Sequence, residues 1–129
     1  MSMFRMLVVD DEPYIVDSVT AILSEMDEFE LDIYPAYSAV EALELVKQRT
    51  FDIVLSDILM PGMDGRALTR ALRTDPHYRS IPIVLMSAGR APDQGIDGYD
   101  AYISKPFNLY MVLDTVTELL GRGGSSPAR

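Results

Sequence analysis

The sequence predicts an α/β domain, a three-layer sandwich with helices on both faces of a mostly parallel sheet. Short apolar runs alternate along the chain with longer segments whose apolar residues recur at helical spacing. Three of these runs are continuously apolar, which is typical of strands covered on both faces. The 129 residues, of which 48% are hydrophobic, can form one hydrophobic core and leave no room for a second full domain.

Five segments are predicted as strands. The continuous apolar runs at 6–9, 53–55 and 83–86 have the character of central strands. The runs at 30–34 and 101–103 are partly alternating or flanked by polar residues, which indicates edge strands. Because strands and helices follow one another in turn, we expect right-handed crossovers and a ligand site beyond the carboxyl ends of the strands.

The first two helices have clear start signals. Pro13, a residue favoured in the first helical turn, marks the start of the first helix. Ser38 followed three positions later by Glu41 forms a capping box at the start of the second helix, which we expect to end near Arg49. Apolar residues three and four positions apart form the inward faces: Ile15, Val19, Ile22, Leu23 and Met26 in the first helix, and Val40, Leu43 and Val46 in the second.

Two further helices are predicted towards the C-terminus. One extends from about Gly65 to Arg73 and is stopped by Thr-Asp-Pro at 74–76. The other begins after Asn108, a favoured N-cap residue, and ends at Gly121. Its inward face consists of apolar residues at helical spacing, namely Leu109, Val112, Leu113, Val116 and Leu120.

Two segments lack the pattern of a regular helix. Residues 89–98 lie between the fourth and fifth strands and are rich in glycine and proline, so the fourth helix of the fold is predicted to be short or irregular. The last residues, GRGGSSPAR, have no apolar anchor. We therefore interpret 121–129 as a flexible tail or linker that follows a domain of residues 1–120.

Composition excludes several classes of function. Cysteine is absent and His77 is the one histidine, which rules out disulfide scaffolds, thiol nucleophiles and histidine-rich metal sites. The 20 acidic and 11 basic residues give a formal net charge of −9, which opposes direct binding to nucleic acid. No apolar run approaches the ~20 residues of a membrane span and no signal peptide is evident, so we expect a soluble, cytoplasmic protein.

Polar residues follow the predicted strands at their carboxyl ends. Three acidic residues at 10–12 follow the first central strand, and Asp57 follows the second. Crowded carboxylates destabilise a fold unless a cation neutralises them, and their hard oxygen atoms suit Mg²⁺. Ser87 ends the third central strand and Lys105 follows the last strand, which adds a hydroxyl and an ammonium at the same edge. A carboxylate nucleophile, a metal site and groups that bind phosphoryl oxygens together indicate aspartyl phosphorylation.

These motifs resemble the receiver domain of two-component response regulators, including the chemotaxis regulators. The resemblance covers about residues 4–120 and depends on VVDDE at 8–12, DILMPGMDG at 57–65, Ser-Ala at 87–88 and KPF at 105–107. Four motifs in this order are far more specific than any one of them alone. The resemblance implies a flavodoxin-like (βα)₅ fold with strand order 2-1-3-4-5.

The resemblance also implies a metal site. Asp57 would accept the phosphoryl group, and Asp11 and Asp57 would ligate Mg²⁺ directly, with Mn²⁺ as an alternative ion. Asp10 would reach the ion mainly through water. The backbone carbonyl of Leu59 would be a further ligand.

Three other residues receive roles from the same resemblance. Lys105 would pair with Asp57 before phosphorylation and with the phosphoryl oxygens afterwards. Ser87 would move to hydrogen-bond the phosphoryl group, and Tyr102 would change its rotamer in response. Glu12, in contrast, is interpreted as a charge at a helix start with only a minor electrostatic effect on the metal.

The expected function is therefore a phosphorylation-controlled switch in a bacterial two-component phosphorelay. Such a chain catalyses only its own phosphorylation and dephosphorylation and has no conventional substrate. Its partners would be a sensor histidine kinase or a histidine phosphotransfer protein, together with an output partner or domain that the sequence does not name. The interval between Ser87 and Lys105 is about one helical turn shorter than the family pattern. This segment belongs to the face that family members use for output or phosphorylation-dependent dimerisation, so signalling through that face is expected to differ here.

Other functions on this fold fit the sequence less well. A flavin or nucleotide site needs a Gly- or Ser/Thr-rich turn after the first strand, and here that turn is DDEP at 10–13. A Mg²⁺-dependent aspartyl phosphatase usually needs an acid two residues after its nucleophile, where this chain has Leu59. A degenerate receiver would act as an interaction module without phosphorylation, but this chain retains the residues needed for the chemistry.

Overall fold

The computed structural model describes residues 3–26, 30–88, 98–105 and 108–125 of the chain. Within these ranges five strands and four helices follow one another in this order: β1 (Met3–Val9), α1 (Pro13–Leu23), β2 (Glu30–Ala36), α2 (Ala39–Gln48), β3 (Ile53–Asp57), α3 (Gly65–Thr74), β4 (Ile83–Ala88), β5 (Ala101–Lys105) and α4 (Leu109–Ser125). No helix in this described part of the chain is both long enough and apolar enough to cross a membrane.

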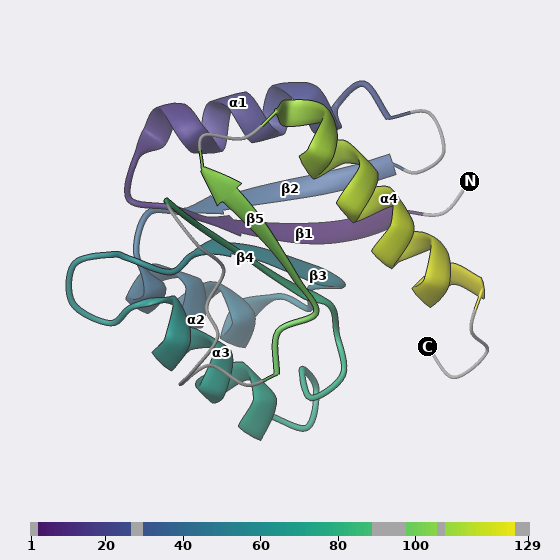
Figure 1. Cartoon of the computed structure of the whole chain (residues 1–129). Helices are drawn as coiled ribbons and strands as arrows, with labels where there is room; N and C mark the ends of the chain where they lie inside the picture. Colours follow the sequence, from purple (N-terminus) through teal and green to yellow (C-terminus); the bar gives the residue numbers. More distant parts are fainter. Residues whose placement is uncertain (1–2, 27–29, 89–97, 106–107, 126–129) are drawn as a thin grey trace.

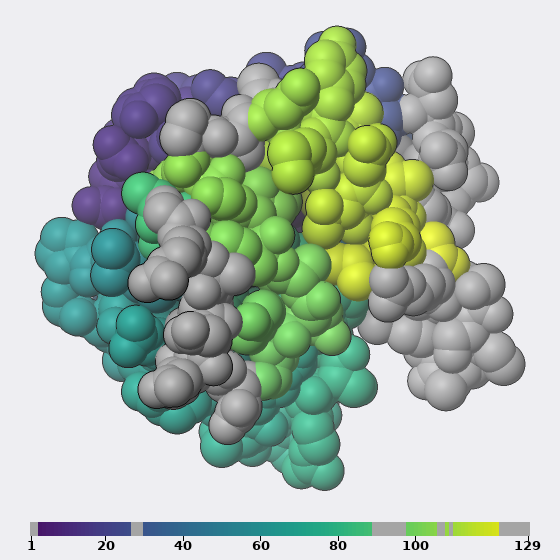
Figure 2. Space-filling model, viewed as in Figure 1, coloured from purple at the N-terminus to yellow at the C-terminus, as the bar shows by residue number. Residues whose placement is uncertain are grey.

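The strands form one parallel sheet in the order β2-β1-β3-β4-β5. In Figure 1, α1 and α4 lie on one face of the sheet and α2 and α3 lie on the other. The predicted three-layer α/β fold and its 2-1-3-4-5 strand order are therefore confirmed. The predicted central strands are β1, β3 and β4, and the predicted edge strands are β2 and β5. The space-filling view in Figure 2 shows edge strand β5 at the surface beside α4.

Two hydrophobic cores explain the continuous apolar runs within the central strands. Leu7 and Val9 of β1 pack towards α2 and α3, whereas Met6 and Val8 of the same strand pack towards α1 and α4. All four side chains are fully buried. Alternate residues of one strand thus belong to different cores, which removes the alternation of polar and apolar residues seen in half-exposed strands.

Local signals at the helix starts work as the sequence predicts. Pro13 occupies the first turn of α1. The Ser38 hydroxyl accepts the Glu41 N–H at 3.1 Å, and the Glu41 carboxylate accepts the N–H of Tyr37, one residue before the N-cap, at 3.0 Å. The Asn108 side chain accepts the Tyr110 N–H at 2.8 Å and so caps α4. Each cap satisfies a backbone donor that the helix itself leaves without a partner.

Three details of the helix predictions were wrong. Val40 is 60% exposed, and Ala39 and Ala42 form the buried face of α2 in its place. Helix α4 continues past Gly121 to Ser125, because glycine lowers helix stability without preventing helical dihedral angles. Met26 lies beyond the end of α1 at Leu23, although it still packs against the core.

Two other predictions concern segments that the structure does not describe. The short or irregular fourth helix was expected at 89–98, of which 89–97 lie outside the described residues. The tail was expected to be flexible over 121–129; residues 121–125 belong to α4, and the last four, 126–129, also lie outside the described residues. Both stay predictions.

Candidate functional site

The strands bring the predicted acidic residues together at the carboxyl edge of the sheet. Val9 pairs with Ser56, so the residues that follow them, Asp10 and Asp57, extend from neighbouring strands. Carboxylate oxygens of Asp10, Asp11 and Asp57 all lie within 4.8 Å of one another. Asp10 is fully buried and Asp57 is nearly so, whereas Asp11 is exposed. The cluster is therefore closed on the protein side and open to solvent at Asp11.

Lys105 extends from the end of β5 into this cluster. Its Nζ atom lies 2.9 Å from Asp10 Oδ2 and 3.3 Å from Asp57 Oδ2. It also lies 3.8 Å from Glu12 Oε1. The structure thus places Lys105 nearer to Asp10 than to Asp57, the partner expected from the sequence. One ammonium group is shared among several carboxylates, and the cluster keeps an excess of negative charge.

The electrostatics of the site follow from burial and from this charge excess. Burial raises the pKa of the Asp57 carboxyl, and the neighbouring Asp10 charge adds to the rise, while Lys105 opposes it. Burial on its own would lower the pKa of Lys105, but its hydrogen bond and charge interaction with Asp10, together with Asp57, raise that pKa overall. Lys105 therefore keeps its charge in the neutral pH range, and further positive charge would stabilise the ionised form of Asp57.

The donor set fits a hard divalent cation. Carboxylate oxygens are the ligands that Mg²⁺ and Ca²⁺ prefer, and three carboxylates converge here. Oxygen atoms bound to one Mg²⁺ ion lie roughly 3–4 Å apart, so small side-chain adjustments or a bridging water accommodate the observed separations. The Leu59 side chain is 64% exposed and points away from the core. The role of its backbone carbonyl as a ligand stays a prediction.

The two predicted switch residues are connected to each other. Ser87 is buried near the end of β4, and its hydroxyl donates to the Ala88 carbonyl at 3.3 Å. The hydroxyl of Tyr102, on the neighbouring strand β5, donates to the Ser87 carbonyl at 3.0 Å. Tyr102 is half-buried and packs against the core that faces α2 and α3. A movement at Ser87 can therefore reach Tyr102 through a direct hydrogen bond.

Gly65 is a supporting residue whose motif predicted only a turn and a helix start. It begins α3, and its N–H donates to the Ile58 carbonyl at 2.8 Å. A Cβ atom at this position would overlap the Asp57 carbonyl oxygen and lie 2.8 Å from Ile58 Cα. Only glycine lets α3 begin directly against the backbone of Asp57. The signal was available, because Gly65 belongs to the same motif as Asp57.

Glu12 is a second supporting residue, for which the sequence predicted only a charge at a helix start. Its backbone N–H donates to Asp10 Oδ1 at 3.0 Å, and its carboxylate lies beside Lys105. Its place directly after two aspartates at a strand end was the available signal.

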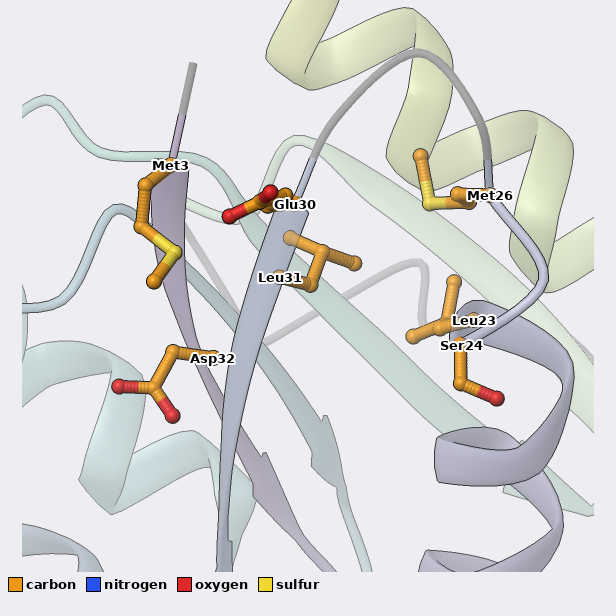
Figure 3. Close-up of a pocket in the computed structure, with 7 residues that line it drawn as sticks. All are labelled: Met3, Leu23, Ser24, Met26, Glu30, Leu31 and Asp32. Atoms are coloured by element: carbon orange, nitrogen blue, oxygen red, sulfur yellow. The ribbon is translucent and has the colours of Figure 1, made fainter. Parts of the chain in front are cut away.

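A separate hollow lies at the opposite edge of the sheet. This pocket has a volume of about 350 Å³. Figure 3 shows the residues that line it, between the end of α1 and the start of β2. It is lined by the amino ends of β1 and β2 and by the end of α1 with the residues that follow it: Met3, Leu23, Ser24, Met26, Glu30, Leu31 and Asp32. The acidic cluster with Lys105 is thus a surface site at the carboxyl edge and lies apart from this pocket.

Comparisons with known proteins agree with this site. The family model described as "Response regulator receiver domain" matches residues 6–117. Response regulator Rre1 of Synechocystis sp. is 36% identical over 125 residues, which are 94% of this chain and 53% of that protein. Sensor protein GacS of Pseudomonas syringae pv. syringae is 34% identical over 131 residues, 96% of this chain but 14% of that protein. The chain thus spans about half of Rre1 and a small part of GacS.

Solved structures show the same similarity in three dimensions. The chemotaxis response regulator CheY4 of Vibrio cholerae matches with a TM-score of 0.81 and 29% identity, covering 92% of this chain and 99% of CheY4. The signal receiver domain of a signal transduction histidine kinase from Syntrophus aciditrophicus matches with a TM-score of 0.83 and 27% identity. That match covers 98% of this chain and 96% of the other.

Proposed function

The chain belongs to the response regulator receiver domain family, and from this premise we propose that Asp57 accepts a phosphoryl group from a phosphohistidine. The observation that carries the proposal is the position of the Asp57 carboxylate, which lies at the open carboxyl edge between an acidic cluster and the Lys105 ammonium. We further propose that phosphorylation switches the domain between two conformations that a partner or output domain distinguishes.

The chemistry follows from the residues around Asp57. A carboxylate oxygen of Asp57 attacks phosphorus, an O–P bond forms, the N–P bond to the donor imidazole breaks, and the imidazole takes the electron pair and a proton. The Lys105 ammonium and the Ser87 hydroxyl neutralise and hydrogen-bond the transferred oxygens. Asp10, Asp11, Asp57 and the Leu59 carbonyl would hold Mg²⁺, or Mn²⁺ in its place, which would supply further positive charge near the phosphoryl oxygens when bound.

The switch proposal depends on the contact between Ser87 and Tyr102. When the Ser87 hydroxyl turns from the Ala88 carbonyl to the phosphoryl group, the end of β4 adjusts, and Tyr102 is bonded to that same backbone. Tyr102 then changes its rotamer at edge strand β5. The chain acts on itself alone in this scheme, in phosphorylation and in dephosphorylation, and turns over no external substrate.

A protein donor fits the surface around the site. Nearly all large apolar side chains that are exposed in the described part of the chain lie after the carboxyl ends of the strands: Tyr14, Tyr37, Val40, Leu59, Met63, Tyr110 and Met111. The exception is Met3, at the opposite edge. Such side chains favour docking of a histidine kinase or histidine phosphotransfer protein directly over Asp57. We place this exchange in the cytoplasm and include dimerisation on phosphorylation among the possible outputs.

Intact-mass spectrometry tests the phosphoacceptor proposal. The protein is incubated with acetyl phosphate and Mg²⁺, beside the Asp57→Asn variant and a sample containing a chelator. We expect one added phosphoryl group in the unsubstituted protein without chelator and none in either control. Absence of the adduct from the protein with Mg²⁺ contradicts the proposal.

A pair of surface variants tests the docking face. Tyr110→Ser removes an apolar side chain at the carboxyl edge, and Met3→Ser makes a similar change at the opposite edge, at nearly equal exposure of 62% and 64%. We expect the first variant to slow transfer from a phosphorylated histidine phosphotransfer protein and the second to leave it unchanged. Both should accept phosphoryl groups from acetyl phosphate at the normal rate. Equal transfer rates from the protein donor would place docking elsewhere.

A further inference from the structure

Three carboxylates share the Lys105 ammonium, and they differ in their access to solvent. Asp10 and Asp57 hold it from inside the protein, with side chains 0% and 8% exposed. Glu12 approaches from the surface at 3.8 Å, with a side chain 47% exposed. Lys105 lies nearer to Asp10 than to Asp57, and the Glu12 backbone is hydrogen-bonded to Asp10, so the attraction of Asp10 and Glu12 for the ammonium competes with that of Asp57.

The Glu12 side chain does not make the hydrogen bond that an N-cap side chain usually makes to its helix. Glu12 is the N-cap of α1, where a serine, threonine, aspartate or asparagine usually accepts a backbone N–H of the first turn. The Glu12 side chain makes no such bond, and Pro13 helps to start the helix. Instead, its backbone N–H donates to Asp10 Oδ1 and its carboxylate faces Lys105. One residue thus contacts both members of the closest ion pair in the site.

We propose that Glu12 is a positioning residue that holds the Lys105 ammonium on the Asp10 side of the site and so limits its movement to phosphoryl oxygens on Asp57. The inference rests on the proposed function, because it concerns the transfer of the phosphoryl group to Asp57. During transfer negative charge accumulates at Asp57, and Lys105 must move towards it. The attraction to Glu12 opposes this movement and slows the step.

Two substitutions separate this role from a simple effect of charge. Glu12→Gln keeps the length of the side chain and removes its charge, whereas Glu12→Asp keeps the charge on a side chain that is one methylene shorter. The rate of phosphorylation is measured over a range of acetyl phosphate concentrations with excess Mg²⁺. The phosphorylation rate at saturating acetyl phosphate reports the position of Lys105. The half-saturating concentration reports the electrostatic repulsion between the anionic donor and the solvent-exposed edge of the site.

We expect both variants to raise the saturating rate about two- to fivefold, the range that a partly exposed ion pair carries. Only Glu12→Gln should also lower the half-saturating concentration. Glu44→Gln, which removes an exposed glutamate from the middle of α2, should change neither quantity. This control accounts for the change in net charge.

Two results overturn the inference and leave the proposed function intact. In the first, both Glu12 variants accept the phosphoryl group at the unsubstituted rate. In the second, Glu12→Gln is faster while Glu12→Asp matches the unsubstituted protein, which assigns the effect to charge alone. A protein that takes up no phosphoryl group even without substitution overturns both proposals together.

Discussion

Replacing Gly65 by alanine should destabilise the protein through a clash with the phosphoacceptor backbone. The added Cβ would lie 2.8 Å from Ile58 Cα, where ordinary contacts are 3.4–4 Å, and would overlap the Asp57 carbonyl oxygen. Both obstacles are main-chain atoms of a buried strand end, so α3 must move outwards by roughly half an ångström or more. Overpacking of this kind lowers the free energy of unfolding by about 2–3 kcal/mol.

Two other glycines provide matched controls for the same chemical change. Gly121 lies in α4 with no atom within 4 Å of an added Cβ, so Gly121→Ala should raise the free energy of unfolding by about 0.5–1 kcal/mol through helix propensity. Gly62 also has open space, but its φ of +76° is in the left-handed region. Gly62→Ala should therefore cost about 1–2 kcal/mol from backbone strain alone.

Urea unfolding followed by circular dichroism measures all three differences. The slope with urea should be the same for every variant, because the surface exposed on unfolding hardly changes. The changes in unfolding free energy for Gly65→Ala and Gly121→Ala should have opposite signs and differ by about 3 kcal/mol. A Gly65→Ala protein as stable as Gly121→Ala would refute the argument that α3 packs directly on the Asp57 backbone.

Three further substitutions test the electrostatics and the hydrogen bonds. Asp57→Asn should raise Tm at pH 7 by about 3–5 °C. Because the pKa of Asp57 is raised in the folded protein, its contribution to stability is complete below about pH 3.8 and is lost as the pH rises through the folded pKa. A gain in Tm that persists at pH 3 would contradict this. Arg73→Met should lower the free energy of unfolding in urea by about 2–4 kcal/mol, because the guanidinium donates to three backbone carbonyls and to Asp100. A decrease of less than about 1 kcal/mol would contradict this role. Tyr78→Phe should lower the free energy of unfolding by about 1–2 kcal/mol by the same method, because the Tyr78 hydroxyl donates to the Arg49 carbonyl at 2.8 Å near the end of α2. An unchanged free energy of unfolding would contradict this.

The fold could be predicted where local sequence determines the outcome. Continuous apolar runs identify β1, β3 and β4, because each of these strands serves two cores. Ser38 and Asn108 mark helix starts through bonds to residues two or three positions away. The sequence does not determine which face of α2 is buried, because Ala39 and Val40 are both apolar and tertiary packing decides which of them faces the core. The strand order came from the family resemblance, since the periodicity of the sequence does not determine it.

The sequence proposes which residues belong to the candidate site, but it does not contain their mutual geometry. Asp10 and Asp11 are adjacent in the chain, and the turn after β1 alone makes one fully buried and the other exposed. The nearest partner of Lys105 depends on how a long side chain crosses from β5, and no motif contains that information. For the same reason the contact between Glu12 and Lys105 became visible only in three dimensions.

The central claim is that Asp57 itself becomes an acyl phosphate, and chemical trapping tests this most directly. Borohydride reduces an aspartyl phosphate to homoserine, so the protein is treated with acetyl phosphate and Mg²⁺, reduced, digested and sequenced by mass spectrometry. Homoserine is expected at position 57 and at no other aspartate position. Homoserine at position 10 or 11, or none anywhere in a sample that contains Mg²⁺, would contradict it.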